Sequence, residues 1–162
     1  MKYNDTVGSL FFIRSVYMQR KIISLFLTLW SVVCLFCFTA CGATASATVL
    51  SSEEKTVIIR IDAAKENATL FNALDNLEKS GAITFAMSGG MIISVNGKAN
   101  VQESATSGYS WMIYTSNTSL SYQEYGSKTY DNVVCYSAAF GAEQLQIKTG
   151  ETIILSYDYW SF

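Results

Sequence analysis

From residue 53 onward, apolar and polar residues alternate with the period of two that is typical of β-strands. Within residues 56–62, Val57, Ile59 and Ile61 fall on one face of the segment, which indicates a half-buried strand. The same alternation, or a short β-prone run, predicts further strands over residues 83–87, 91–95, 109–114, 133–137, 145–147 and 152–157. Most of this part of the chain is therefore predicted to consist of strands and turns.

Residues 70–79 form the one segment with the periodicity of a helix. Three leucines at i, i+4 and i+7 lie on one face with Phe71 beside them, and Asn, Asp, Glu and Lys side chains occupy the opposite face. Thr69 is placed to cap the N-terminus, and Gly81 stands where a residue in the left-handed conformation ends a helix. We therefore expect one helix that packs its leucines against the sheet.

Asn96 and Gly97 predict a tight hairpin after the strand at 91–95, because both residues tolerate a positive φ. Residues 115–132 are expected to form a long loop that carries three tyrosines. One helix packed on a mixed or antiparallel sheet predicts an α+β fold with a β-grasp-like arrangement, which follows an N-terminal signal segment.

Residues 18–41 have the order of a bacterial secretory signal. A pair of basic residues precedes an apolar run, residues 22–38, that holds no charge and is followed by small residues. Because signals begin with their basic segment, Met18 is the expected initiator, and residues 1–17 are expected to be an upstream mis-start. The alternative is an uncleaved membrane anchor, since about 17 apolar residues are the minimum that crosses the hydrocarbon core.

The segment Phe38-Thr39-Ala40-Cys41 resembles the lipobox of bacterial lipoproteins. The resemblance implies that residues 1–40 are a signal peptide, that Cys41 is lipidated, and that the chain is attached to the cell membrane on its extracytoplasmic side. Residues 41–55 are mostly small and polar, so we expect a flexible tether there. Residues 56–162 are then expected to be the folded domain.

The average composition conceals two different parts. Half of the 162 residues are apolar, and the formal charge is −2. Residues 1–40 carry four basic residues and one acidic residue, whereas residues 41–162 carry seven basic and twelve acidic residues. The basic residues of the second part are scattered singly in an acidic domain, which is not the pattern of a nucleic-acid-binding surface. We therefore expect no nucleic-acid partner.

The chain contains no histidine, which excludes Ser-His-Asp and Cys-His catalytic sites and histidine-ligated metals. No acidic cluster has the spacing of a calcium site, so no metal or cofactor is expected to be required. Cys34 and Cys37 lie in the apolar run, and Cys135 is expected to be a buried, inert thiol. A carboxylate pair such as Asp131 with Glu124 remains open, but we expect a protein that is not an enzyme.

Four segments of the domain occur in a recognisable order: Ala68–Leu74, Gly90–Gly97, Gly108–Tyr114 and Gly141–Leu155. Together they resemble the transcobalamin-like C-terminal domain family, over about residues 56–158. Members of this family are soluble-ligand-binding, β-grasp-like modules of bacterial surface proteins and animal cobalamin carriers. The resemblance implies a domain that binds a small ligand such as a cobalamin-like corrinoid, and it leaves the identity of the ligand open.

Aromatic side chains are the candidate ligand contacts. Trp111 lies within a predicted strand, so core packing and a ligand-facing ring are both open. The other candidates lie in or near expected loops, where binding groups usually sit: Tyr122, Tyr125, Tyr136 and Phe140. The sequence thus predicts a lipid-anchored extracytoplasmic module that binds a small ligand. The alternative is a cell-surface module that contacts proteins or the envelope through the 115–132 loop or an open strand edge.

Overall fold

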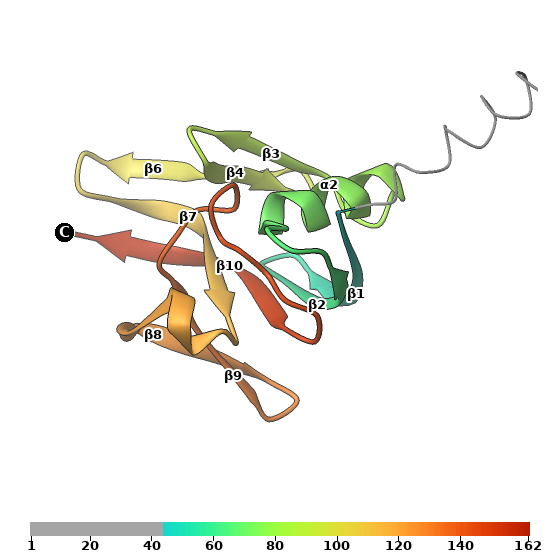
Figure 1. Cartoon of the computed structure of the whole chain (residues 1–162). Helices are drawn as coiled ribbons and strands as arrows, with labels where there is room; N and C mark the ends of the chain where they lie inside the picture. Colours follow the sequence, from blue (N-terminus) through green and yellow to red (C-terminus); the bar gives the residue numbers. More distant parts are fainter. Residues whose placement is uncertain (1–43) are drawn as a thin grey trace, which may run out of the picture. The chain divides into compact units, whose positions relative to one another are not determined.

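Strands dominate residues 44–162, the part of the chain that the computed structural model describes (Figure 1). In chain order they are β1 (Ala45–Glu53), β2 (Thr56–Ala64), β3 (Phe85–Ser88), β4 (Met91–Val95), β5 (Lys98–Ala99), β6 (Val101–Ser104), β7 (Ser107–Thr115), β8 (Ser121–Tyr130), β9 (Val133–Ala138) and β10 (Thr152–Ser161). Helix α2 (Leu70–Lys79) follows β2, and a 3-10 helix, η1 (Thr118–Leu120), precedes β8.

Several predictions concern residues outside the described part. They are the signal peptide over residues 1–40, the mis-start over residues 1–17 and the lipidation of Cys41. Among the described residues, no helix has both the length and the apolar character needed to cross a membrane.

Seven strands form one antiparallel sheet in the order β1-β2-β10-β7-β9-β8, with β6 also paired to β7. The pairing of β2 with β10 ends where Thr56 lies opposite Ser156, whereas the pairing of β10 with β7 continues to Ser161. The ends of β7 and β10 therefore extend beyond the β1–β2 hairpin, with β6 alongside (Figure 1). Strands β3, β4 and β5 form a separate small sheet.

The main core lies between helix α2 and one face of the large sheet. Val57, Ile59 and Ile61 are fully buried there, as the alternation of β2 predicted. The three leucines of α2 are buried against them, and each contributes on the order of 1.5–3 kcal/mol to stability. On the opposite face of the sheet lies a smaller cluster of buried residues: Ile58, Tyr114, Cys135 and Ile154.

Helix α2 has the predicted bounds and the predicted ends. The backbone N–H of Thr69 donates to Oδ1 of Asn72 (2.9 Å) at the N-terminus. At the C-terminus Gly81 adopts a φ of 76°, and its N–H donates to the carbonyl of Glu78 (2.8 Å). This left-handed glycine satisfies carbonyls that the helix itself leaves without partners.

The predicted hairpin is confirmed, because Asn96 (φ 48°) and Gly97 (φ 79°) connect β4 to β5. One predicted strand is wrong: residues 145–147 make only an isolated bridge to Thr69. The carbonyl of Leu145 accepts from the N–H of Leu70, and the N–H of Ile147 donates to the carbonyl of Ala68, so these residues bond to the start of the helix and not to a neighbouring strand. The apolar side chains at 145 and 147 are buried, so burial without sheet pairing produced the strand-like pattern.

The predicted α+β class with a β-grasp-like arrangement is wrong, because the fold is β-rich. Strand accounts for 59% of the described residues and helix for 11%. Three strands that the sequence pattern did not predict, β1, β6 and β8, make the difference. Their side chains are mostly exposed or small and so give little apolar alternation. Backbone pairing with neighbouring strands orders them instead.

The flexible tether predicted over residues 41–55 is wrong for residues 45–53, which form β1. This strand pairs with β2 from Ala45, opposite Ala64, to Glu53, opposite Thr56. Small side chains let β1 lie close to helix α2, where Asn76 Nδ2 donates to the carbonyl of Ala45. The folded domain therefore includes β1 and does not begin at residue 56.

The long loop predicted over residues 115–132 is also wrong for most of its length. Residues 121–130 form β8, which pairs with β9. Asp131 and Asn132 adopt φ values of 46° and 64° in the turn between these strands. Such a pair of positive φ angles suits a tight hairpin turn, and Asp and Asn tolerate it better than most residues.

Candidate functional site

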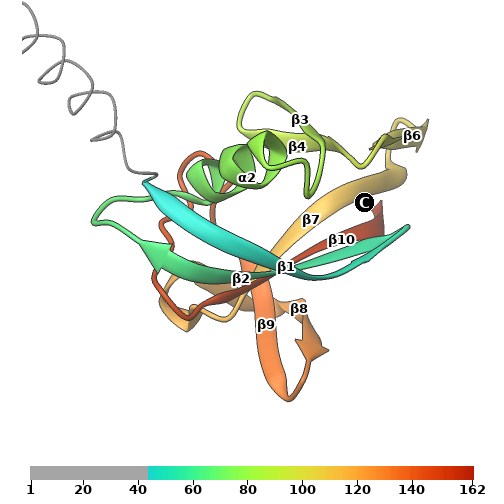
Figure 2. The same cartoon turned by 90° about the vertical axis from the view of Figure 1, so that its right-hand side faces the viewer.

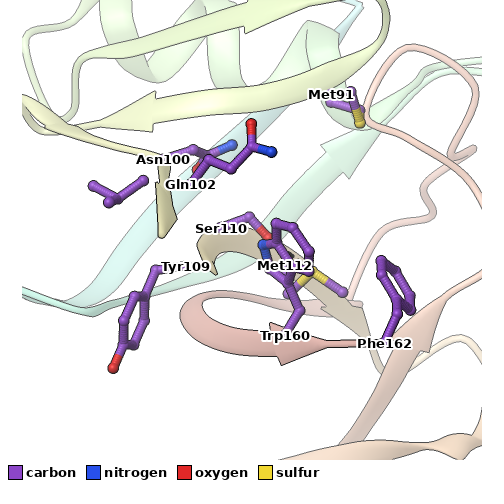
Figure 3. A pocket seen from close by; sticks show the side chains of 9 residues that line it. Met91, Asn100, Gln102, Tyr109, Ser110, Met112, Trp160 and Phe162 are labelled. Atoms are coloured by element: carbon purple, nitrogen blue, oxygen red, sulfur yellow. Dashed lines mark hydrogen bonds between the residues drawn. The ribbon is translucent and has the colours of Figure 1, made fainter. Parts of the chain in front are cut away.

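Strands β7 and β10 extend beyond the β1–β2 hairpin, and a groove of about 580 Å³ lies at this end of them, beside β6 (Figure 3). We call it the aromatic groove. Its lining residues are Met91, Asn100, Val101, Gln102, Tyr109, Ser110, Met112, Trp160 and Phe162. None of these side chains is charged, so the aromatic groove favours neutral, apolar or ring-bearing ligands.

One wall of the groove depends on a glycine. Gly108 lies directly opposite Trp160 in the β7–β10 pairing. A Cβ at position 108 would lie 3.1 Å from the Trp160 ring and would also clash with the carbonyl of Val101. Because Gly108 has no side chain, the Trp160 indole packs directly against the backbone of β7. Phe162 continues this wall, with its ring centroid 5.4 Å from that of Trp160.

Two methionines give the groove an adaptable surface. Met112 comes from β7, and Figure 3 shows it next to Trp160, whereas Met91 comes from the start of β4. Ser110 Oγ donates to the sulfur of Met112 (3.5 Å). Methionine side chains are flexible and polarizable, so they fit ligands of varied shape.

The two amide side chains of the groove have different roles. Asn100 Oδ1 accepts from the backbone N–H of Trp111 (2.9 Å), and its Nδ2 donates to the carbonyl of Ile92 (3.0 Å). Asn100 therefore links β7 to β4 and helps to shape the groove. The Gln102 side chain lies on exposed β6 and makes no hydrogen bond to another described residue. Its amide is therefore available to a ligand.

On the face of β7 and β10 opposite to Ser110 and Met112, four aromatic rings are in contact, and one of them belongs to Tyr109, which also borders the groove. Tyr157 stacks on Tyr109 at 5.6 Å and contacts Trp111 at 5.5 Å, and Tyr159 meets Tyr109 edge-on at 5.2 Å. The Tyr157 hydroxyl donates to the carbonyl of Ala99 (2.9 Å). These contacts join β7 and β10 to β5 of the small sheet, and they hold the strands beneath the groove in place.

A charged cluster lies on the groove side of the sheet. Asp158 accepts hydrogen bonds from Tyr114 (2.7 Å), Ser156 (2.8 Å) and Lys128 (2.9 Å). Burial acts to raise the pKa of Asp158, but these hydrogen bonds outweigh it and leave the pKa below its usual value. Burial, together with the neighbouring carboxylate, raises the pKa of Tyr114. At neutral pH the cluster is therefore a carboxylate that accepts a hydrogen bond from a neutral phenol and forms an ion pair with Lys128.

The sequence-predicted site residues do not lie in the aromatic groove. Trp111 is 5% exposed and packs in the main core, where its Nε1 donates to the carbonyl of Lys98 (2.7 Å). Tyr122 and Tyr125 lie exposed on β8 with ring centroids 5.5 Å apart. Tyr136 and Phe140 are placed elsewhere: Tyr136 is half-buried on β9, and Phe140 is 44% exposed after it. Of these five predicted site residues, the structure brings the rings of Tyr122 and Tyr125 into contact.

Sequence reasoning missed the groove residues Trp160 and Phe162. The signal was present in the aromatic-rich end of the 152–162 segment. Its meaning depended on Gly108 in another strand, however, and no local pattern connects the two positions.

Cys135 is buried, and burial raises its pKa to about 11. Its Sγ donates to the carbonyl of Thr152 (3.5 Å). A thiol in this environment is weakly reactive, as expected from the sequence. Within residues 44–162, no group of His, Cys, Asp and Glu side chains is arranged to hold a metal ion.

Comparisons with protein-family models, curated proteins and solved structures found no match to this chain. The chemistry of the aromatic groove is therefore inferred from its own residues.

Proposed function

We propose that this chain is a non-catalytic, lipid-anchored extracytoplasmic module that binds a small ligand in the aromatic groove. The observation that carries the proposal is an uncharged groove of about 580 Å³ with Trp160 and Phe162 in its wall. This volume lies within the range of about 300–1,000 Å³ that is common for small-molecule sites. Phe162 is 97% exposed, which leaves its ring free to cover a bound ligand.

The groove chemistry supports a ligand with a flat apolar face and at least one hydrogen-bonding edge. Aromatic rings and methionine sulfur atoms make favourable contacts with such faces. The Gln102 amide and the Ser110 hydroxyl line the same groove and supply donors and acceptors for an edge. A cobalamin-like corrinoid combines a flat macrocycle with amide side chains, so corrinoids are the first ligands to test. A corrinoid is larger than the groove and would insert one edge.

The anchoring part of the proposal rests on the sequence. The apolar run at 22–38 and the lipobox-like segment that ends at Cys41 support export and lipidation. Two or more acyl chains are needed for stable attachment, since one chain binds only marginally. In the proposed mature protein, only residues 42–44 separate the lipidated cysteine from β1.

Calorimetric titration of the full chain with a panel of corrinoids and flat aromatic solutes tests the binding. For a ligand that binds, Phe162→Ala should raise Kd about tenfold, which corresponds to about 1.4 kcal/mol. Phe140→Ala is the matched control, because Phe140 is also exposed but does not line the groove. Equal loss of affinity in both variants, or no binding below about millimolar by any ligand, would reject the groove as the site.

A second candidate function is a cell-surface module that contacts another protein or the envelope. The observation that favours it is the exposed pair Tyr122 and Tyr125 on β8, a strand at the edge of the large sheet. Edge strands and exposed tyrosines are both common in protein contacts. If the Tyr122→Ser, Tyr125→Ser double variant lost retention on the cell envelope while Phe162→Ala kept it, this second function would replace the first.

A further inference from the structure

The aromatic groove and the start of β1 lie at opposite ends of the large sheet. Strand β1 begins at Ala45, which pairs with Ala64 at the end of β2. At the other end of β2, Thr56 pairs with Ser156 of β10, and β10 then continues to Trp160 in the groove wall. Figures 1 and 2 agree that the start of β1 and the C-terminal end of β10 lie on opposite sides.

Strand register gives the scale of this separation. The path runs along β2 from Ala64 to Thr56 and then along β10 from Ser156 to Trp160. At about 3.3 Å per residue these twelve steps span roughly 40 Å, which strand twist shortens somewhat. The four steps from Cys41 to Ala45 span about 14 Å at most, even when fully extended. Residues 41–45 are therefore too short to reach along the sheet, so a lipid attached to Cys41 does not reach the groove.

The end of the sheet where β1 starts is polar. The backbone N–H of Lys65 donates to the carbonyl of Thr44 (2.9 Å), and Thr149 Oγ1 accepts from the N–H of Ala64 (3.0 Å). The segments at 62–67 and 148–150 that surround this end expose Asp, Lys, Glu, Asn and Thr side chains. Such a surface suits contact with lipid headgroups and not insertion into the hydrocarbon core. The large exposed apolar side chains of the groove lie at the other end.

We propose that the anchored domain holds its aromatic groove away from the lipid surface and takes its ligand from the aqueous phase, not from the bilayer. The inference rests on the proposed function, because it requires attachment at Cys41. It narrows the ligand class to neutral, ring-bearing solutes that are present in water, and it disfavours membrane lipids as ligands.

Site-specific fluorescence quenching on vesicles tests this orientation. The full chain is expressed in a bacterium that processes lipoproteins, purified with its acyl chains, and reconstituted in phosphatidylcholine–phosphatidylglycerol vesicles. One variant, Ala63→Cys, places a thiol-linked fluorophore beside the start of β1, and a matched variant, Ala105→Cys, places it in the exposed β6–β7 turn beside the groove. Cys135 is fully buried and remains unlabelled.

Lipids with a nitroxide headgroup should quench the label at position 63 at least threefold more than the label at position 105. Equal quenching at both positions, or stronger quenching at 105, would overturn the proposed orientation. Vesicle flotation separates this result from failure of the proposed function. A protein that floats with the vesicles but shows equal quenching rejects the orientation alone, whereas a protein that does not float rejects the anchor and the orientation together.

Discussion

The ring of Trp160 lies over Gly108, its direct partner across β7 and β10, with 3.1 Å between the ring and the position that a Cβ at residue 108 would occupy. An aromatic ring that covers a glycine in a neighbouring strand replaces the packing that the glycine lacks. Here the same contact forms one wall of the aromatic groove. Stability at the end of the sheet and the shape of the groove are therefore expected to change together.

Gly108→Ala should destabilise the domain by about 1–3 kcal/mol, because the added methyl group meets both the Trp160 ring and the backbone carbonyl of Val101. Urea unfolding monitored by circular dichroism measures the loss. The control is Ser110→Ala on the same strand, which removes only a weak contact to a sulfur atom and should change stability by less than about 0.5 kcal/mol. A Gly108→Ala variant as stable as the control would contradict the close contact.

Asn100→Ala should cost about 1–3 kcal/mol of stability, because it leaves the N–H of Trp111 and the carbonyl of Ile92 without their hydrogen-bond partner. The matched control is Gln102→Ala, which removes a similar amide that makes no hydrogen bond to a described residue. Thermal unfolding of both variants distinguishes a structural amide from one available to ligand. If Gln102→Ala were the more destabilising change, the assignment of the two roles would be reversed.

The Asp158 cluster predicts a pH dependence of stability at the acid end. The folded-state pKa of Asp158 is lowered, so the unfolded state binds its proton more readily, and stability rises with pH in this range. The contribution is present above the unfolded pKa of about 3.9 and is lost as pH falls through the lower folded value. Asp158→Asn should therefore flatten the stability profile below about pH 4, as measured by unfolding at a series of pH values.

Asp131→Asn is the control for this profile, because Asp131 is exposed in the β8–β9 turn and asparagine tolerates its positive φ. The Asp131→Asn variant should leave the stability profile below about pH 4 unchanged. The same flattening in both variants would show that general charge, and not the contacts of Asp158 with Tyr114 and Lys128, sets the profile.

Cys41→Ala should abolish incorporation of a radiolabelled fatty acid and block maturation of the precursor in a bacterial host. The physical reason is that the lipid would be attached to the sulfur atom of Cys41, which alanine lacks. Cys135→Ala is the matched control and should leave labelling intact, because that thiol is buried. Normal labelling of the Cys41→Ala protein would contradict the lipobox interpretation.

The sequence by itself determined the elements whose side chains carry their own periodic pattern. Helix α2 appears with the predicted bounds because its leucines recur at helical spacing and Gly81 ends it. Strand β4 and the Asn96-Gly97 turn were also predictable, because the alternation and the positive φ angles are local properties. Among the sequence-predicted site residues, the burial of Trp111 was one of two interpretations that the sequence left open, and the structure decided it.

Only the tertiary structure decided the elements and the site that depend on partners distant in sequence. Strand β1 has no apolar alternation strong enough to reveal it, and it is ordered by pairing with β2 and by packing beside α2. The groove wall depends on Gly108 and Trp160, which are brought together by the β7–β10 register. Strands β7 and β10 are not joined by a hairpin turn that would set their register, so this register depends on how the whole sheet packs.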